Sequence, residues 1–180
     1  MSFFKKWDIA RPQWFPDGHT LLFQKDKVRS IPKGQFLSLA VPDIDIYKLN
    51  INTRKITPLA NSELNEEGYN ISPDGSKIVY LKDDSAWLMD SQGNNKQNLK
   101  ISVDYDYIWG NTFSWSPDSS KFVCKSVQSK AQNLYKLFIY DLTTKKSDII
   151  SNQTSLTTLQ APIWSPSGNY IIMYLSAPLL

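Results

Sequence analysis

A short turn motif recurs four times along this chain of 180 residues. Each copy places a large apolar residue two positions before a proline and follows the proline with small or acidic turn residues. The copies are Trp14-Phe-Pro-Asp-Gly18, Ile71-Ser-Pro-Asp-Gly75, Trp115-Ser-Pro-Asp-Ser119 and Trp164-Ser-Pro-Ser-Gly168. The prolines lie 57, 44 and 49 residues apart. This is close to the roughly 40 to 50 residues of folds that stack one repeated supersecondary unit.

An apolar triplet begins five residues after each of the four prolines. The triplets are Leu21-Leu22-Phe23, Ile78-Val79-Tyr80, Phe122-Val123-Cys124 and Ile171-Ile172-Met173. Short apolar runs that lie between turn residues indicate buried strands. We expect these triplets to be buried together with Trp14, Trp115 and Trp164.

Two more strands are predicted in each complete unit. The third lies around Ile46-Tyr47, Leu88-Met89 and Ile139-Tyr140, and the fourth ends near Leu59, Leu99 and Ile150. Four antiparallel strands per unit make a propeller blade. The sequence therefore predicts an all-β protein, a β-propeller fragment with three complete four-stranded blades and half of a fourth. Within a single domain over residues 1–180, the blades span about 12–59, 69–99 and 112–150, and the half blade spans 162–175.

The turn, the apolar strand and the later Ile-Tyr pair together resemble the TolB-like propeller repeats, a WD40-like family with Pro-Asp-Gly turns. Ser119 departs from the usual glycine and Ser167 from the usual aspartate, so altered turn geometry is expected there. The same repeat is found in the propeller domains of prolyl-oligopeptidase-like enzymes. The resemblance therefore implies a fold and leaves the function open.

The half blade predicts association. Closed propellers use about four to eight blades, and an open set exposes strand edges and apolar faces. Two explanations stay open: the chain is truncated or split, or a second chain completes the ring. Residues 2–9 are either a strand that closes the last blade or a leader segment.

Composition argues against several partners. The net charge is +3 and the lysines are spread along the chain, so nucleic acid is not an expected partner. The single Cys124 forms no intramolecular disulfide and no cysteine cluster for a metal. No signal sequence is evident near the start, and no run approaches roughly 18 apolar residues. We expect a cytoplasmic protein with no membrane span and no cofactor.

The longer connections are expected at one end of the blades, opposite the Pro-Asp-Gly turns. The residues predicted to bind a protein or peptide partner there are Asp104, Tyr105, Asp106, Tyr107 and Trp109, with Glu66 and Glu67. Aromatic side chains beside carboxylates suit a peptide or a cationic group. The alternative is that the aromatics pack between blades and the glutamates lie in a solvated loop.

No catalytic constellation is predicted. His19 is the only histidine and follows a turn, Cys124 lies in a predicted buried strand, and no Gly-x-Ser-x-Gly elbow occurs. The aspartate pairs lack the spacing of a calcium loop, so no metal site is expected. The preferred function is a non-catalytic binding scaffold. The alternatives are a detached propeller of a prolyl-oligopeptidase-like serine hydrolase and a small-molecule or sugar binder.

Overall fold

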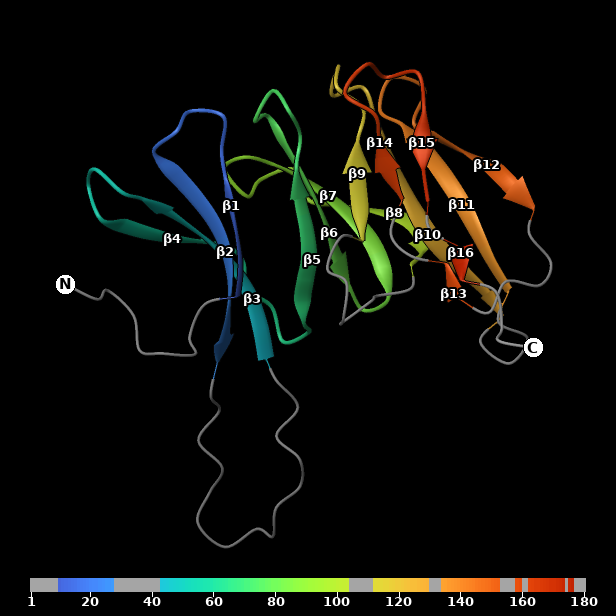
Figure 1. Ribbon diagram of the computed structural model, residues 1–180. Helices are drawn as coiled ribbons and strands as arrows, with labels where there is room; N and C mark the ends of the chain where they lie inside the picture. Colours follow the sequence, from blue (N-terminus) through green and yellow to red (C-terminus); the bar gives the residue numbers. More distant parts are fainter. Residues whose placement is uncertain are drawn as a thin grey trace, which may run out of the picture. The chain divides into compact units, whose positions relative to one another are not determined.

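The computed structural model describes residues 10–27, 43–103, 112–129, 134–152, 158–159, 162–173 and 175–176. Every regular element among them is a β-strand, which confirms the all-β prediction (Figure 1). No helix that could cross a membrane occurs in these ranges. The chain forms two compact units, Met1–Glu67 and Gly68–Leu180.

The first unit holds one antiparallel sheet of four strands in the order β1-β2-β3-β4. The strands are β1 (Ala10–Trp14), β2 (Thr20–Lys27), β3 (Asp43–Asn50) and β4 (Lys55–Ala60). Leu22 and Ile46 are fully buried on one face of the sheet. On the other face Phe23 stacks on Tyr47, with ring centroids 5.8 Å apart. The alternation of the sequence therefore sets both faces of this sheet.

A second sheet follows, in the order β5-β6-β7-β8. Its strands are β5 (Glu66–Ile71), β6 (Lys77–Lys82), β7 (Ser85–Asp90) and β8 (Gln97–Ser102). Asp83 and Asp84 join β6 to β7, with φ of 50° and 53°. Two successive residues at positive φ are typical of a type I′ hairpin turn, which aspartate tolerates better than most residues.

The third sheet has the order β12-β11-β10-β9. It consists of β9 (Phe113–Trp115), β10 (Lys121–Ser129), β11 (Leu134–Asp141) and β12 (Lys146–Asn152). Side chains of the second and third sheets share one buried core. At its centre the Phe122 ring lies 5.7 Å from Phe113 and 5.4 Å from both Trp115 and Tyr140. This aromatic cluster makes the two sheets a rigid support for their connections.

The last strands form a hairpin rather than a full sheet. They are β13 (Thr158–Leu159), β14 (Ile163–Trp164), β15 (Ile171–Ile172) and β16 (Leu175–Ser176). β14 pairs with β15, and β13 pairs with β16. The registers of these two pairings differ by one residue. This is the first half of a four-stranded unit, as the repeat predicts.

Burial differs along the motif. Trp115 is buried, and its indole Nε1 donates to the Asn70 carbonyl of the preceding sheet at 3.1 Å. Trp14 is 56% exposed, so the expectation that it is buried is wrong. Its sheet is the first in the described part of the chain, and no earlier sheet covers it there. Ile172 is 66% exposed, which corrects the expectation for the fourth triplet; its hairpin has no third strand within the described residues.

Candidate functional site

The connection between the second and third sheets is the predicted aromatic segment. Asp104, Tyr105, Asp106, Tyr107 and Trp109 lie outside the described residues, so their contacts stay predictions. The flanks of the segment are described and buried. Val103 is 2% exposed and its amide donates to the Asp84 carbonyl at 2.9 Å, while Thr112 is 5% exposed. The segment therefore follows a buried residue beside the β6–β7 turn, Val103, and ends before a second buried residue, Thr112.

Glu66 and Glu67 are buried at the start of β5, with 1% and 5% of each residue exposed. The Ser62 amide donates to both carboxylate oxygens of Glu66, at 3.2 and 3.1 Å, and the Ser62 hydroxyl donates to it as well. Glu63, in contrast, is exposed. The structure thus gives Glu66 a local role that closes the loop before β5. Partner binding by Glu66 and Glu67 stays a prediction.

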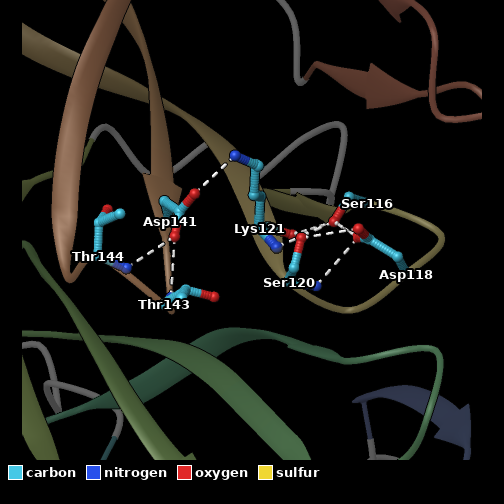
Figure 2. A network of polar contacts seen from close by, with 7 residues as sticks. All are labelled: Ser116, Asp118, Ser120, Lys121, Asp141, Thr143 and Thr144. Carbon is cyan, nitrogen blue, oxygen red and sulfur yellow. Dashed lines mark hydrogen bonds and ion pairs between the residues drawn. The ribbon is translucent and has the colours of Figure 1, made fainter.

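Polar groups at the other end of the strands are engaged within their own turns (Figure 2). Asp118 Oδ1 accepts hydrogen bonds from the Ser116 hydroxyl at 2.6 Å and from the Ser120 amide at 3.1 Å, and Oδ2 accepts from the Ser120 hydroxyl at 2.8 Å. The Ser116 hydroxyl is the largest cause of the lowered pKa of the Asp118 carboxyl. This carboxylate is therefore ionised at neutral pH, and both of its oxygens accept hydrogen bonds within the turn.

An ion pair joins this turn to the next one. Lys121 Nζ lies 2.6 Å from Asp141 Oδ2, while Asp141 Oδ1 accepts the amides of Thr143 and Thr144 at 2.9 Å each (Figure 2). The ammonium of Lys121, with these amides, lowers the pKa of Asp141 to about 2. Asp141 in turn raises the pKa of Lys121. The pair is only partly covered, so solvent screens it, and we expect it to orient the two turns and to stabilise the fold modestly.

Ser119 keeps the usual turn geometry. Its φ is 62°, beside 73° for Gly75 at the equivalent position of the second sheet. The Ser119 hydroxyl accepts the Asp74 amide at 3.0 Å, which links the turns of neighbouring sheets. The altered geometry expected at Ser119 is therefore not found. The sequence analysis did not consider that the hydroxyl of a serine can make a hydrogen bond that offsets the cost of its positive φ, which glycine adopts without such a cost.

The two residues considered for catalysis from the sequence are His19 in a turn and Cys124 in a buried strand. His19 Nδ1 lies 2.7 Å from the Asp17 carbonyl oxygen, within the same turn. Cys124 is fully buried in β10, and burial raises the pKa of its thiol to about 12, so it is not a thiolate at neutral pH. In the described ranges no three histidine, cysteine or acidic side chains form a metal-binding group.

Comparisons with known proteins identify the fold. No family model matches the sequence. No curated protein matches it either. Among solved structures, TolB from Acinetobacter baumannii is similar at a TM-score of 0.61 and 20% identity, over 93% of this chain and 37% of that one. The β-propeller domain of the trilobed protease from Pyrococcus furiosus is similar at 0.60 and 15%, over 87% and 45%.

An oligogalacturonate lyase from Vibrio parahaemolyticus is also similar, at a TM-score of 0.60 and 19% identity, over 88% of this chain and 44% of that one. The chain thus spans less than half the length of these three neighbours. Such distant likeness shows the fold alone. It confirms the predicted class, an all-β propeller fragment whose sheets correspond to blades, and its relatives in structure include both TolB and enzymes.

Proposed function

We propose that this chain is a non-catalytic binding module that recognises a protein or peptide through the end of its blades that carries the longer connections. The supporting observation is the placement of residues 104–111 between Val103 and Thr112, two buried points on neighbouring sheets. Loops held by a rigid scaffold are where proteins concentrate recognition. The segment offers three aromatic side chains and two carboxylates, which suit a partner with cationic and aromatic groups.

At the opposite end of the blades, the aspartates of the proline turns already accept hydrogen bonds within their own turns. Asp17 accepts hydrogen bonds from the amides of His19 and Thr20 and from the Thr20 hydroxyl, at 2.7 to 2.9 Å. Asp74 and Asp118 are engaged in the same way by the serines of their turns. A carboxylate whose hydrogen bonds are already made within the protein gains little binding free energy from a hydrogen bond to a partner. This contrast supports the longer connections as the recognition surface.

The test replaces Tyr105, Tyr107 and Trp109 together by alanine. Partners captured by the wild-type chain are identified by mass spectrometry, and their affinities are then measured by titration calorimetry. The triple variant should lose more than about 2 kcal/mol of binding free energy, as aromatic anchors do. Trp14→Ala, an exposed aromatic of the first sheet, is the matched control and should bind like the wild type.

Equal affinities of the wild type and the triple variant would contradict the proposal. A variant that loses its β-sheet circular dichroism would show instead that these aromatics pack between blades. The two outcomes are distinguishable because the first leaves the fold intact.

A second candidate is a propeller domain within a longer serine hydrolase. It is favoured by the similarity to the trilobed protease propeller, of which the chain covers 45%. That function requires an α/β domain with a Gly-x-Ser-x-Gly elbow in the same reading frame. Sequencing the gene on both sides of these residues tests it. A sugar-binding role, suggested by the lyase, is tested by titrating oligogalacturonate.

A further inference from the structure

Two polar residues are buried at facing positions of the third sheet. Lys125, on β10, is 7% exposed, and Thr112, directly before β9, is 5% exposed. The last residues that pair between these two strands are Cys124 and Phe113. One position further, the same register places Lys125 opposite Thr112. Opposed residues of an antiparallel pair have Cβ atoms about 5 Å apart.

Both side chains lie on the face of the sheet away from the aromatic cluster. Cys124, the residue before Lys125, belongs to the core shared with the second sheet. Successive residues of a strand point to opposite faces, so Lys125 shares the other face with Val123. Leu137 lies directly opposite Lys125 on β11, and both Val123 and Leu137 are fully buried. The lysine therefore shares its face with apolar side chains.

The hydroxyl of Thr112 is the second unusual group of this pair. Its oxygen is buried and has no hydrogen-bond partner within the described residues. A buried hydroxyl without a partner destabilises the fold, and so does a buried lysine unless a negative charge balances it. Costly polar groups of this kind cluster at functional sites.

The repeat shows that the fold does not require a polar pair here. Lys125 directly follows its apolar triplet, and Leu81 holds this position in the second sheet, where it is 2% exposed in the core. Thr112 stands three residues before the large apolar residue of its motif, and Gly68 holds that position in the second sheet. Leucine and glycine thus complete a four-stranded sheet at the same two positions.

We propose that Lys125 and Thr112 form a binding site for a carboxylate, which accepts hydrogen bonds from the ammonium and the hydroxyl. One ammonium balances one negative charge, whereas a doubly charged phosphate would leave an unbalanced charge beside apolar side chains. Val123 and Leu137 suit a carboxylate on a hydrophobic body, either a small molecule or the C-terminal residue of a peptide. This inference does not depend on the proposed binding function, which uses the aromatics of residues 104–111.

The test titrates the full chain with benzoate at constant ionic strength and follows the backbone amides by ¹H–¹⁵N NMR. The amides of residues 112 and 123–126 should shift to saturation. Lys125→Met should raise the dissociation constant at least about tenfold, because it removes the charge that pairs with the carboxylate. Lys121→Met is the matched control, since it removes an ammonium from the other end of the same strand and should bind benzoate like the wild type.

A second variant separates binding from folding. Thr112→Val removes the hydroxyl and should weaken benzoate binding about two- to tenfold, the range for one hydrogen bond. Its urea midpoint should stay unchanged or rise, because the hydroxyl has no hydrogen bond within the described residues to lose. Lys125→Met should also keep its urea midpoint, since the second sheet buries Leu81 at this position.

A peptide that ends in phenylalanine distinguishes the two sources of the carboxylate. With a free C-terminus it should compete with benzoate if the site takes the end of a peptide chain, and benzoate alone should bind if the site takes a small molecule. The same peptide with an amidated C-terminus should not compete in either case.

Three results would overturn the proposal. The first is a wild-type chain whose amides show no saturable shift with benzoate. The second is equal dissociation constants for Lys125→Met and Lys121→Met. The third is a large fall in the urea midpoint of Lys125→Met while Thr112→Val binds benzoate like the wild type, because the lysine would then serve the fold rather than a ligand.

Discussion

The third sheet and the terminal hairpin begin with the same turn and differ in what surrounds it. In the third sheet the Ser116 amide donates to the Lys121 carbonyl at 2.8 Å, and in the hairpin the Ser165 amide donates to the Tyr170 carbonyl at 2.8 Å. The proline presets the first of the turn dihedrals in both. The backbone of the turn is therefore set locally, before any neighbouring strand contributes.

The side chains of the two turns are less alike. Asp118 accepts three hydrogen bonds at 2.6 to 3.1 Å. Ser167 stands in its place in the hairpin, where its hydroxyl lies 3.2 Å from the Ser165 hydroxyl and accepts the Asn169 amide at 3.4 Å. The acidic residue strengthens a turn that forms without it.

Burial separates the two regions most. Trp115 and Trp164 hold the same position of the motif, but Trp115 is 6% exposed and donates to Asn70 of the preceding sheet. Trp164 is only half-buried, and its indole donates to Gly168 of its own turn at 3.0 Å. The same residue type thus supports the packing of two sheets in one place and a single hairpin in the other.

The largest expected difference follows from this contrast. Trp115→Ala should lower the free energy of unfolding by about 3 to 5 kcal/mol, because it opens a cavity in the shared aromatic core. Trp164→Ala should cost about 1 to 2 kcal/mol, the range for partial burial. Urea unfolding, followed by fluorescence at a concentration where the chain is monomeric, measures both. Equal costs would contradict the difference in packing between the two regions.

Acid should distinguish the two regions as well. The pKa of Asp141 is lowered to about 2 from 3.8, so its ion pair stabilises the folded state fully above about pH 4 and loses this effect as the pH falls toward 2. Asp141→Asn should therefore unfold at lower urea than the wild type at pH 6, and the two midpoints should converge near pH 2.

Ser167→Ala, in a hairpin turn that has no carboxylate, is the control for this titration. The difference between its urea midpoint and that of the wild type should be independent of pH from 6 to 2. If the difference for Asp141→Asn also stays constant, the Lys121–Asp141 pair does not stabilise the folded protein.

The sequence predicts the strands well because their signals are local. Proline turns and the apolar triplets that follow them fix where the first and second strands lie, and the alternation of Leu22 and Phe23 assigns each to a face. Burial of a side chain depends on whether an adjacent sheet covers it. The periodicity of the sequence does not say which sheets have such a neighbour. That is why Trp14 and Ile172 are exposed although their motif matches that of Trp115.

The candidate site was less predictable. Glu66 and Glu67 resemble a solvated acidic loop in sequence, whereas the structure buries both and brings the Ser62 amide and hydroxyl to Glu66. A serine four residues before a glutamate is the only local sign of this contact, and it is weak. The aromatics of residues 104–111 lie outside the described ranges, and their role depends on a partner that no intrachain pattern specifies.

The smallest expected effect is at Ser119, where two contributions oppose each other. Ser119→Gly relieves a positive φ of 62°, worth about 1 kcal/mol in a residue with a side chain, and it removes a hydrogen bond from the Asp74 amide that contributes a similar amount. The urea midpoint should therefore move little. Gly75→Ser has no offsetting bond in the structure and should destabilise by about 1 kcal/mol. A Ser119→Gly protein as unstable as Gly75→Ser would show that the link between neighbouring turns outweighs the strain.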